Sequence, residues 1–114
     1  MLNSAKWDVK TERSLSDIFN AAADAIERHG HCKMLMRNDF GQMCLLGAIN
    51  FVVNGDALKS IVGEINTVKM LDRLTPLVGG CPVHWNNVKE RTQEEVISLL
   101  RVAAKKEEGK PLPW

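Results

Sequence analysis

Residues Gly41–Val53, with the sequence GQMCLLGAINFVV, form the most continuously apolar run of the chain. The run contains one of the three cysteines, Cys44, and a Gly-Ala pair at positions 47 and 48. Two small residues in succession allow another segment to approach closely. We expect a helix from about residue 44 to residue 54, buried nearly all round because Asn50 is its only polar interruption. The remaining segments are expected to pack around this helix.

Two further helices are predicted by their capping residues. Ser14 is the expected N-cap of a helix over residues 15–29, which carries one apolar stripe and ends at Gly30. The sequence Thr92-Gln93-Glu94-Glu95 forms a capping box before a helix with a second apolar stripe, and Gly109 ends it.

The segments between these helices have weaker patterns. Residues 33–36 and 42–45 fit either a short β-hairpin or an irregular loop that leads into the next helix. Asp56 is expected to cap a helix that continues, bent or in two pieces, as far as Thr75-Pro76. Residues 77–88 are expected to form a loop with Trp85 as its one large anchor.

The sum of these patterns is a mainly α fold. We expect a compact bundle of four to five helices, with or without one short β-hairpin near residues 33–45. Residues 1–13 form a charged N-terminal leader, residues 14–108 a single helical domain, and residues 109–114 an extended C-terminal tail.

Composition narrows the functional class. Fifteen basic and fourteen acidic residues leave a formal net charge of +1, which does not favour a nucleic-acid-binding protein. No apolar run approaches the ~20 residues that cross a bilayer, and the N-terminus has no signal-peptide pattern. We therefore expect a cytoplasmic protein, with no membrane association.

Cysteines and histidines offer the residues most capable of chemistry. Two clusters, His29-Gly30-His31-Cys32 and Cys81-Pro82-Val83-His84, supply potential metal ligands. Their spacing departs from that of structural zinc sites, so we predict no metal and no cofactor, and keep the set His29, His31, Cys32, Cys81 and His84 as the alternative. Cys44 or Cys32 beside a histidine would suit a nucleophile, but the apolar neighbours of Cys44 favour a buried, inert thiol.

The three tryptophans lie outside the predicted helices. Trp7, Trp85 and Trp114 either anchor loops and termini to the core or form part of an interface, where Trp is enriched. Asn86 is expected to seat the Trp85 loop, and Arg91 to bridge that loop to an acidic group. Together these five residues are the predicted interaction site.

Several short sequences resemble a known family. They are Asp39-Phe40-Gly41-Gln42-Met43-Cys44-Leu45-Leu46-Gly47-Ala48-Ile49, then Trp85-Asn86-Asn87, and then Arg91-Thr92-Gln93-Glu94-Glu95-Val96. In order and spacing, they are similar to a family of small proteins from actinobacteria and their bacteriophages that is known only as a domain of unknown function. The chain departs from that pattern at His31, where Trp is common, and at Asn87, where Asp is common. The resemblance implies no catalytic residue, and its phage members imply an accessory protein that acts on host machinery.

The expected function is therefore a non-enzymatic, cytoplasmic interaction protein. If it is phage-encoded, it works in the host cell cytoplasm on a host or phage protein. The alternatives are a small Cys/His metal-binding protein or enzyme, and a nucleic-acid-binding protein. A homodimer is compatible with the apolar surface that a small helical domain leaves uncovered.

Overall fold

A computed structural model describes residues 14–59 and 65–114. Within these ranges the chain forms six helices and no strand: α2 (Leu15–His29), α3 (Leu45–Asn54), α4 (Ile65–Asp72), α5 (Thr75–Val78), α6 (Pro82–Asn87) and α7 (Gln93–Lys106). The mainly α prediction is confirmed. The predicted leader, including Trp7, lies outside the described residues.

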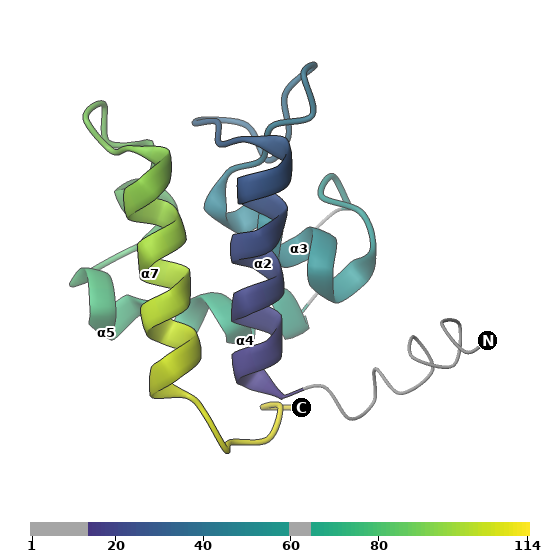
Figure 1. The fold of residues 1–114 in the computed structure, drawn as a ribbon, viewed down its shortest axis with the longest axis vertical. Helices are drawn as coiled ribbons and strands as arrows, with labels where there is room; N and C mark the ends of the chain where they lie inside the picture. Colours follow the sequence, from purple (N-terminus) through teal and green to yellow (C-terminus); the bar gives the residue numbers. More distant parts are fainter. Residues whose placement is uncertain (1–13, 60–64) are drawn as a thin grey trace.

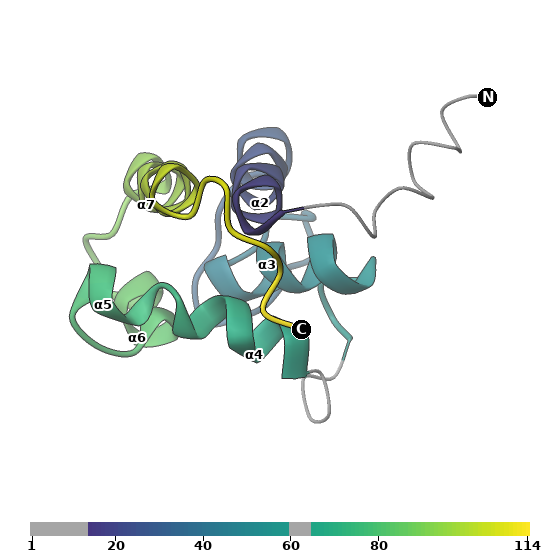
Figure 2. The ribbon, with the colours of Figure 1, turned by 90° about the horizontal axis from the view of Figure 1, so that it is seen from below.

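Helices α2 and α7 run antiparallel and side by side along the long axis of the molecule (Figure 1). The shorter helices α3, α4, α5 and α6 form a second layer, which lies below the α2–α7 pair in the view of Figure 2. The core lies between the layers and consists of apolar side chains of α2, α3 and α7, together with Met70 and Leu74. The apolar stripes of α2 and α7 therefore both face this core.

The ends of the long helices follow the predicted caps. The Asp17 N–H donates to Ser14 Oγ at 3.1 Å, and the Ser14 N–H donates to Asp17 Oδ2 at 3.1 Å. Thr92 and Glu95 make the same reciprocal pair at the start of α7, with distances of 2.9 and 3.1 Å. Because each pair satisfies two helix-terminal N–H groups, local sequence alone defines where these helices begin.

The central helix α3 is buried along its first half. Cys44 is its N-cap, and the Cys44 sulfur accepts from the Gly47 N–H at 3.3 Å. Leu45 to Asn50 are buried, whereas Phe51 is exposed, so the prediction of a helix buried nearly all round holds only for its N-terminal half. Gly55, with a φ of 83°, ends the helix in the left-handed conformation that glycine favours.

Gly47 shows why small residues occupy this helix. A Cβ built on Gly47 would overlap the carbonyl oxygen of Met36 and would lie 2.7 Å from its carbonyl carbon. The backbone of residue 36 therefore lies directly on α3. The close approach predicted from the Gly-Ala pair is present at this point.

Three predictions about the weaker segments need correction. A β-hairpin at residues 33–45 is not supported, since isolated bridges from Met43 to His31 and to Arg37 are the only β-type pairing among the described residues. Residues 77–88 are not a continuous loop, because α5 extends to Val78 and α6 occupies Pro82–Asn87. Proline in the first turn of each short helix favours helical φ and has no N–H that needs a partner.

The segment after α3 also differs from the prediction, which had a helix starting after Asp56. Asp56 caps only a turn, in which its Oδ1 accepts from the Leu58 N–H at 2.9 Å. The prediction for residues 60–64 lies outside the described residues. Helix α4 covers Ile65–Asp72, and Thr67 is buried within it and donates to Asn50 Oδ1 at 3.0 Å.

Candidate functional site

The segment between α2 and α3, residues 30–44, projects from one end of the helix pair (Figure 1). We call it the apical loop. Its two ends are joined by backbone hydrogen bonds, from the Cys32 N–H to the Met43 oxygen at 3.2 Å and from the Met43 N–H to the Gly30 oxygen at 3.0 Å. The loop therefore leaves and returns to the domain at one place.

Asn38 shapes the tip of the apical loop. Its side-chain oxygen accepts from the N–H groups of Phe40 and Gln42, both at 3.0 Å, and its Nδ2 donates to Gln42 Oε1 at 2.7 Å. Gly41 completes the turn with a φ of 83°. Asn side chains commonly form turns in this way, so the tip holds a defined conformation without a strand.

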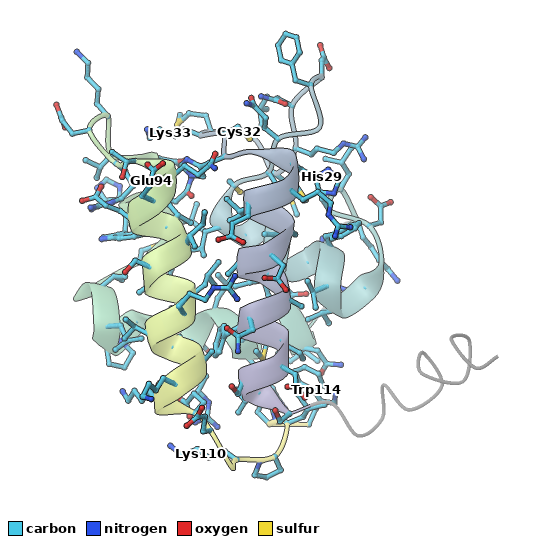
Figure 3. All side chains as sticks on the ribbon, in the orientation of Figure 1. His29, Cys32, Lys33, Glu94, Lys110 and Trp114 are labelled. Atoms are coloured by element: carbon cyan, nitrogen blue, oxygen red, sulfur yellow. The ribbon has the colours of Figure 1, made fainter. Side chains whose placement is uncertain are left out.

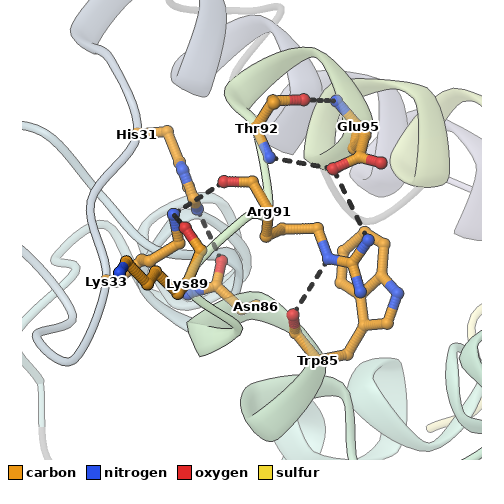
Figure 4. Close-up of polar contacts among 8 residues, drawn as sticks. All are labelled: His31, Lys33, Trp85, Asn86, Lys89, Arg91, Thr92 and Glu95. Carbon is orange, nitrogen blue, oxygen red and sulfur yellow. Dashed lines mark hydrogen bonds and ion pairs between the residues drawn. The ribbon is translucent and has the colours of Figure 1, made fainter.

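Asn86 holds the base of the loop. It is 1% exposed, and its side-chain oxygen accepts from the Leu45 N–H at 3.0 Å and from His31 Nε2 at 2.7 Å (Figure 4). Its Nδ2 donates to the Cys32 oxygen at 3.4 Å and to Asn87 Oδ1 at 3.0 Å. One buried amide of α6 thus joins the start of the apical loop to the first turn of α3.

A second set of contacts connects the loop to the segment from the end of α6 to the start of α7. Lys33 Nζ donates to the carbonyl oxygens of Arg91 at 2.6 Å and Lys89 at 3.3 Å (Figure 4). The His31 N–H donates to Gln93 Oε1 at 3.0 Å. The Met34 N–H donates to Asn87 Oδ1 at 2.9 Å and supports Met34 at a φ of 71°. These bonds restrain the loop on the side that faces α7.

Arg91 bridges the end of α6 to an acidic group, as the sequence predicted. Its Nε donates to the Trp85 oxygen at 3.0 Å, and its guanidinium lies 3.9 Å from the centre of the Trp85 ring. Its Nη1 lies 3.5 Å from Glu95 Oε1. The N–H of Thr92 and the nearby Arg91 both lower the pKa of Glu95. Trp85 is half-buried against the core, so much of its surface is used within the chain.

The C-terminal tail lies along the opposite end of the domain, where Lys110 and Trp114 are labelled in Figure 3. Leu112 packs against the core, and the Pro113 oxygen accepts from Lys69 Nζ at 3.4 Å. Trp114 remains 44% exposed. The structure therefore separates Trp114 from Trp85, Asn86 and Arg91, which the sequence had placed in one predicted site.

Burial governs the chemistry of the cysteines near the loop. Burial raises the pKa of the Cys32 thiol and of the Cys44 thiol, and the neighbouring Cys44 raises that of Cys32 further. Both thiols are therefore protonated at neutral pH, which disfavours nucleophilic catalysis. Burial also lowers the pKa of His31, against the opposing effect of its bond to Asn86.

The potential metal ligands remain dispersed. Cys81 is exposed at the start of α6, whereas Cys32 is buried at the base of the apical loop. Within residues 14–59 and 65–114, no three His, Cys, Asp or Glu side chains converge as a metal-binding group. No described helix is both long and apolar enough to cross a membrane.

The two most exposed large apolar side chains of the described residues lie on the apical loop. Phe40 is 86% exposed and Met34 77%, and Leu35 beside Met34 is 56% exposed, close to the 58% of Ile65. A groove beside the loop is lined by Arg37, Asn38, Asp39 and Gly41 of the loop, together with the exposed side chains of Phe51 and Leu58. Apolar surface of this kind on a restrained loop is typical of an interaction site.

A family model for a family of unknown function, DUF6197, matches residues 10–106 of the chain. The chain belongs to this family. The match covers the whole helical core, the apical loop and the Trp85–Glu95 segment. No curated protein and no solved structure matches the chain. The match therefore agrees with the sequence resemblance to a domain of unknown function. Because the family has no known function, membership assigns no activity to the chain.

Sequence reasoning did not single out His31 as a loop contact, nor Met34, Leu35 and Phe40 as a surface. The available signal was weak, since Met34 and Leu35 lie in an apolar run between Lys33 and Arg37, and Phe40 lies among the turn residues at 38–41. That run was interpreted as either half of a short β-hairpin or an irregular loop. Only the exposure of these side chains in the folded chain shows that they form a surface.

Proposed function

We propose that this chain is a non-enzymatic, cytoplasmic interaction protein that presents the apical loop to a protein partner. The observation that carries the proposal is the exposure of Met34, Leu35 and Phe40 on a loop whose base is fixed by buried hydrogen bonds. Neighbouring exposed apolar side chains commonly mark a site of protein interaction. The proposal moves the contact surface from the tryptophans to this loop.

The restraint of the loop supports binding because a preformed surface loses little conformational freedom when it meets a partner. Asn38 fixes the tip, Asn86 fixes the base, and Lys33 ties one side to the residues before α7. A loop with exposed apolar side chains and no such bonds would collapse onto the domain. Here the bonds support its outward conformation.

The resemblance to proteins of actinobacteria and their phages supports an accessory role, in which the partner is a host or phage protein. The protonated thiols of Cys32 and Cys44 give no support to the enzymatic alternative. The net charge of only +1 likewise gives no support to the nucleic-acid-binding alternative.

The test is affinity purification from the native host, followed by reconstitution of binding with the purified partner. Met34→Ser, Leu35→Ser and Phe40→Ser are combined in one variant. Because truncation of a central apolar contact commonly weakens binding by more than about 1.4 kcal/mol, we expect at least a tenfold loss of affinity. Thermal melts should be unchanged, since the three side chains are exposed.

Val102→Ser is the matched control, because Val102 is an exposed apolar residue of α7 outside the loop. It should bind like the wild type. A variant lacking residues 110–114 tests the tail by the same assay. Sedimentation of the purified chain tests whether the loop binds a second copy. Equal affinity of the loop variant and the wild type would refute the proposed surface.

A further inference from the structure

Cys32 and Cys44 lie in register at the base of the apical loop. The residues that precede them, His31 and Met43, form a parallel bridge. The residues that follow a parallel bridge lie on one face of the pairing, and neighbouring strands are about 4.8 Å apart. Figure 3 shows Cys32 at the end of α2, where the loop begins. The two side chains are therefore directed to the same side.

The two sulfurs share one small buried environment. Cys32, Cys44 and Leu46 form a buried cluster separate from the main core. Cys32 Sγ donates to the oxygens of Leu35 at 3.2 Å and Gln42 at 3.3 Å, whereas Cys44 Sγ accepts from the Gly47 N–H. A disulfide needs a Cα–Cα separation of roughly 4.4–6.8 Å, a range that includes the spacing of about 4.8 Å between paired strands.

We propose that Cys32 and Cys44 form an intramolecular disulfide when the protein meets a low-molecular-weight disulfide such as oxidised glutathione. The Cys32 thiolate attacks one glutathione sulfur, breaks the glutathione S–S bond and releases one glutathione thiolate. The Cys44 thiolate then attacks the Cys32 sulfur and releases the second glutathione. Two thiol protons leave the protein, and its two electrons reduce one oxidised glutathione to two molecules of glutathione.

Cys32 is the first nucleophile because its sulfur contacts are partly exposed, whereas those of Cys44 are buried. Because both thiols are buried, thiol–disulfide exchange requires local opening of the loop, and the reaction is therefore slow. The bond would close residues 33–43 at their base and restrict the same loop that carries Met34, Leu35 and Phe40. The chemistry itself does not depend on the proposed partner.

The experiment uses the full chain with Cys81→Ser, which removes the exposed thiol. The protein is incubated with oxidised glutathione at mildly alkaline pH and digested with trypsin without reduction. Cleavage after Arg28, Lys33, Arg37 and Lys59 separates the two cysteines. We expect an intact monomer that has lost two hydrogen atoms, and a linked pair of peptides, residues 29–33 and 38–59. Amide exchange within residues 33–42 should become slower.

Cys44→Ser in the same background should stop at a glutathione adduct on Cys32. Because Ser is a good N-cap, this variant is expected to fold. Cys32→Ser should give no linked peptide. The proposal is overturned if the parent protein keeps both thiols, accumulates only the glutathione adduct, or forms only dimers between chains. Unchanged amide exchange in the linked protein would overturn the restriction of the loop.

Discussion

Replacement of Gly47 by Ala tests the closest contact in the fold. Gly47 lies in the first turn of α3, against the backbone of Met36 in the apical loop. An added Cβ would lie 2.7 Å from the Met36 carbonyl carbon and 3.1 Å from its Cα. These are backbone atoms, so no side-chain rotation can relieve the overlap. The loop and α3 must move apart.

The size of the effect follows from three contributions. Overpacking of a close contact destabilises by about 1–3 kcal/mol. The Met36 oxygen also accepts from the Cys44 N–H at 3.1 Å, and loss of that bond adds about 1 kcal/mol. Alanine recovers about 1 kcal/mol through its higher helix propensity. We expect a net loss of about 2 kcal/mol in the free energy of unfolding.

Urea denaturation measures this loss directly, and a thermal melt should show a decrease of about 10 °C. Gly80→Ala is the matched control, because its Cβ would meet nothing within 4 Å and its backbone does not need glycine. The control should lie within about 0.5 kcal/mol of the wild type. If Gly47→Ala were as stable as the wild type, the close packing of the loop on α3 would be refuted.

Three further predictions concern the base of the loop and the cysteines. Asn86→Ala should lower the free energy of unfolding in urea by about 2 kcal/mol, since it leaves the buried Leu45 N–H without an acceptor, whereas Asn87→Ala should lower it less. Burial lowers the pKa of His31 in the folded state, so the unfolded chain binds this proton more readily. The free energy of unfolding should therefore fall as the pH drops below about 6.5, the ordinary pKa of histidine. If a His31→Gln variant showed the same fall in urea titrations, His31 would not be its cause. Native protein should show one fast-reacting thiol in a titration with a thiol reagent, and Cys81→Ser none.

Local sequence was sufficient for the long helices. Ser14 and Thr92 cap their helices through residues three positions away, so the pattern contains the whole interaction. The apolar stripes likewise identified the faces of α2 and α7 that form the core. The short helices α5 and α6 were missed because Gly and Pro usually indicate loops, although Pro also favours a first helical turn.

The candidate site depends on contacts between distant residues. Asn86 meets Leu45, 41 positions away, and His31, 55 positions away. An Asn in a sequence can be a turn residue, a cap or a buried hub, and only its surroundings in the folded chain distinguish these roles.

The sequence by itself determined that the chain is mainly helical, where its long helices begin and which faces they bury. These features arise from interactions over three or four residues and from hydrophobic periodicity. Only the tertiary structure decided that Met34, Leu35 and Phe40 are exposed on a loop and that residues 33–45 do not pair as a hairpin. The physical reason is that Asn38 and Asn86 satisfy the backbone of the apical loop, while the backbone at Met36 rests on Gly47.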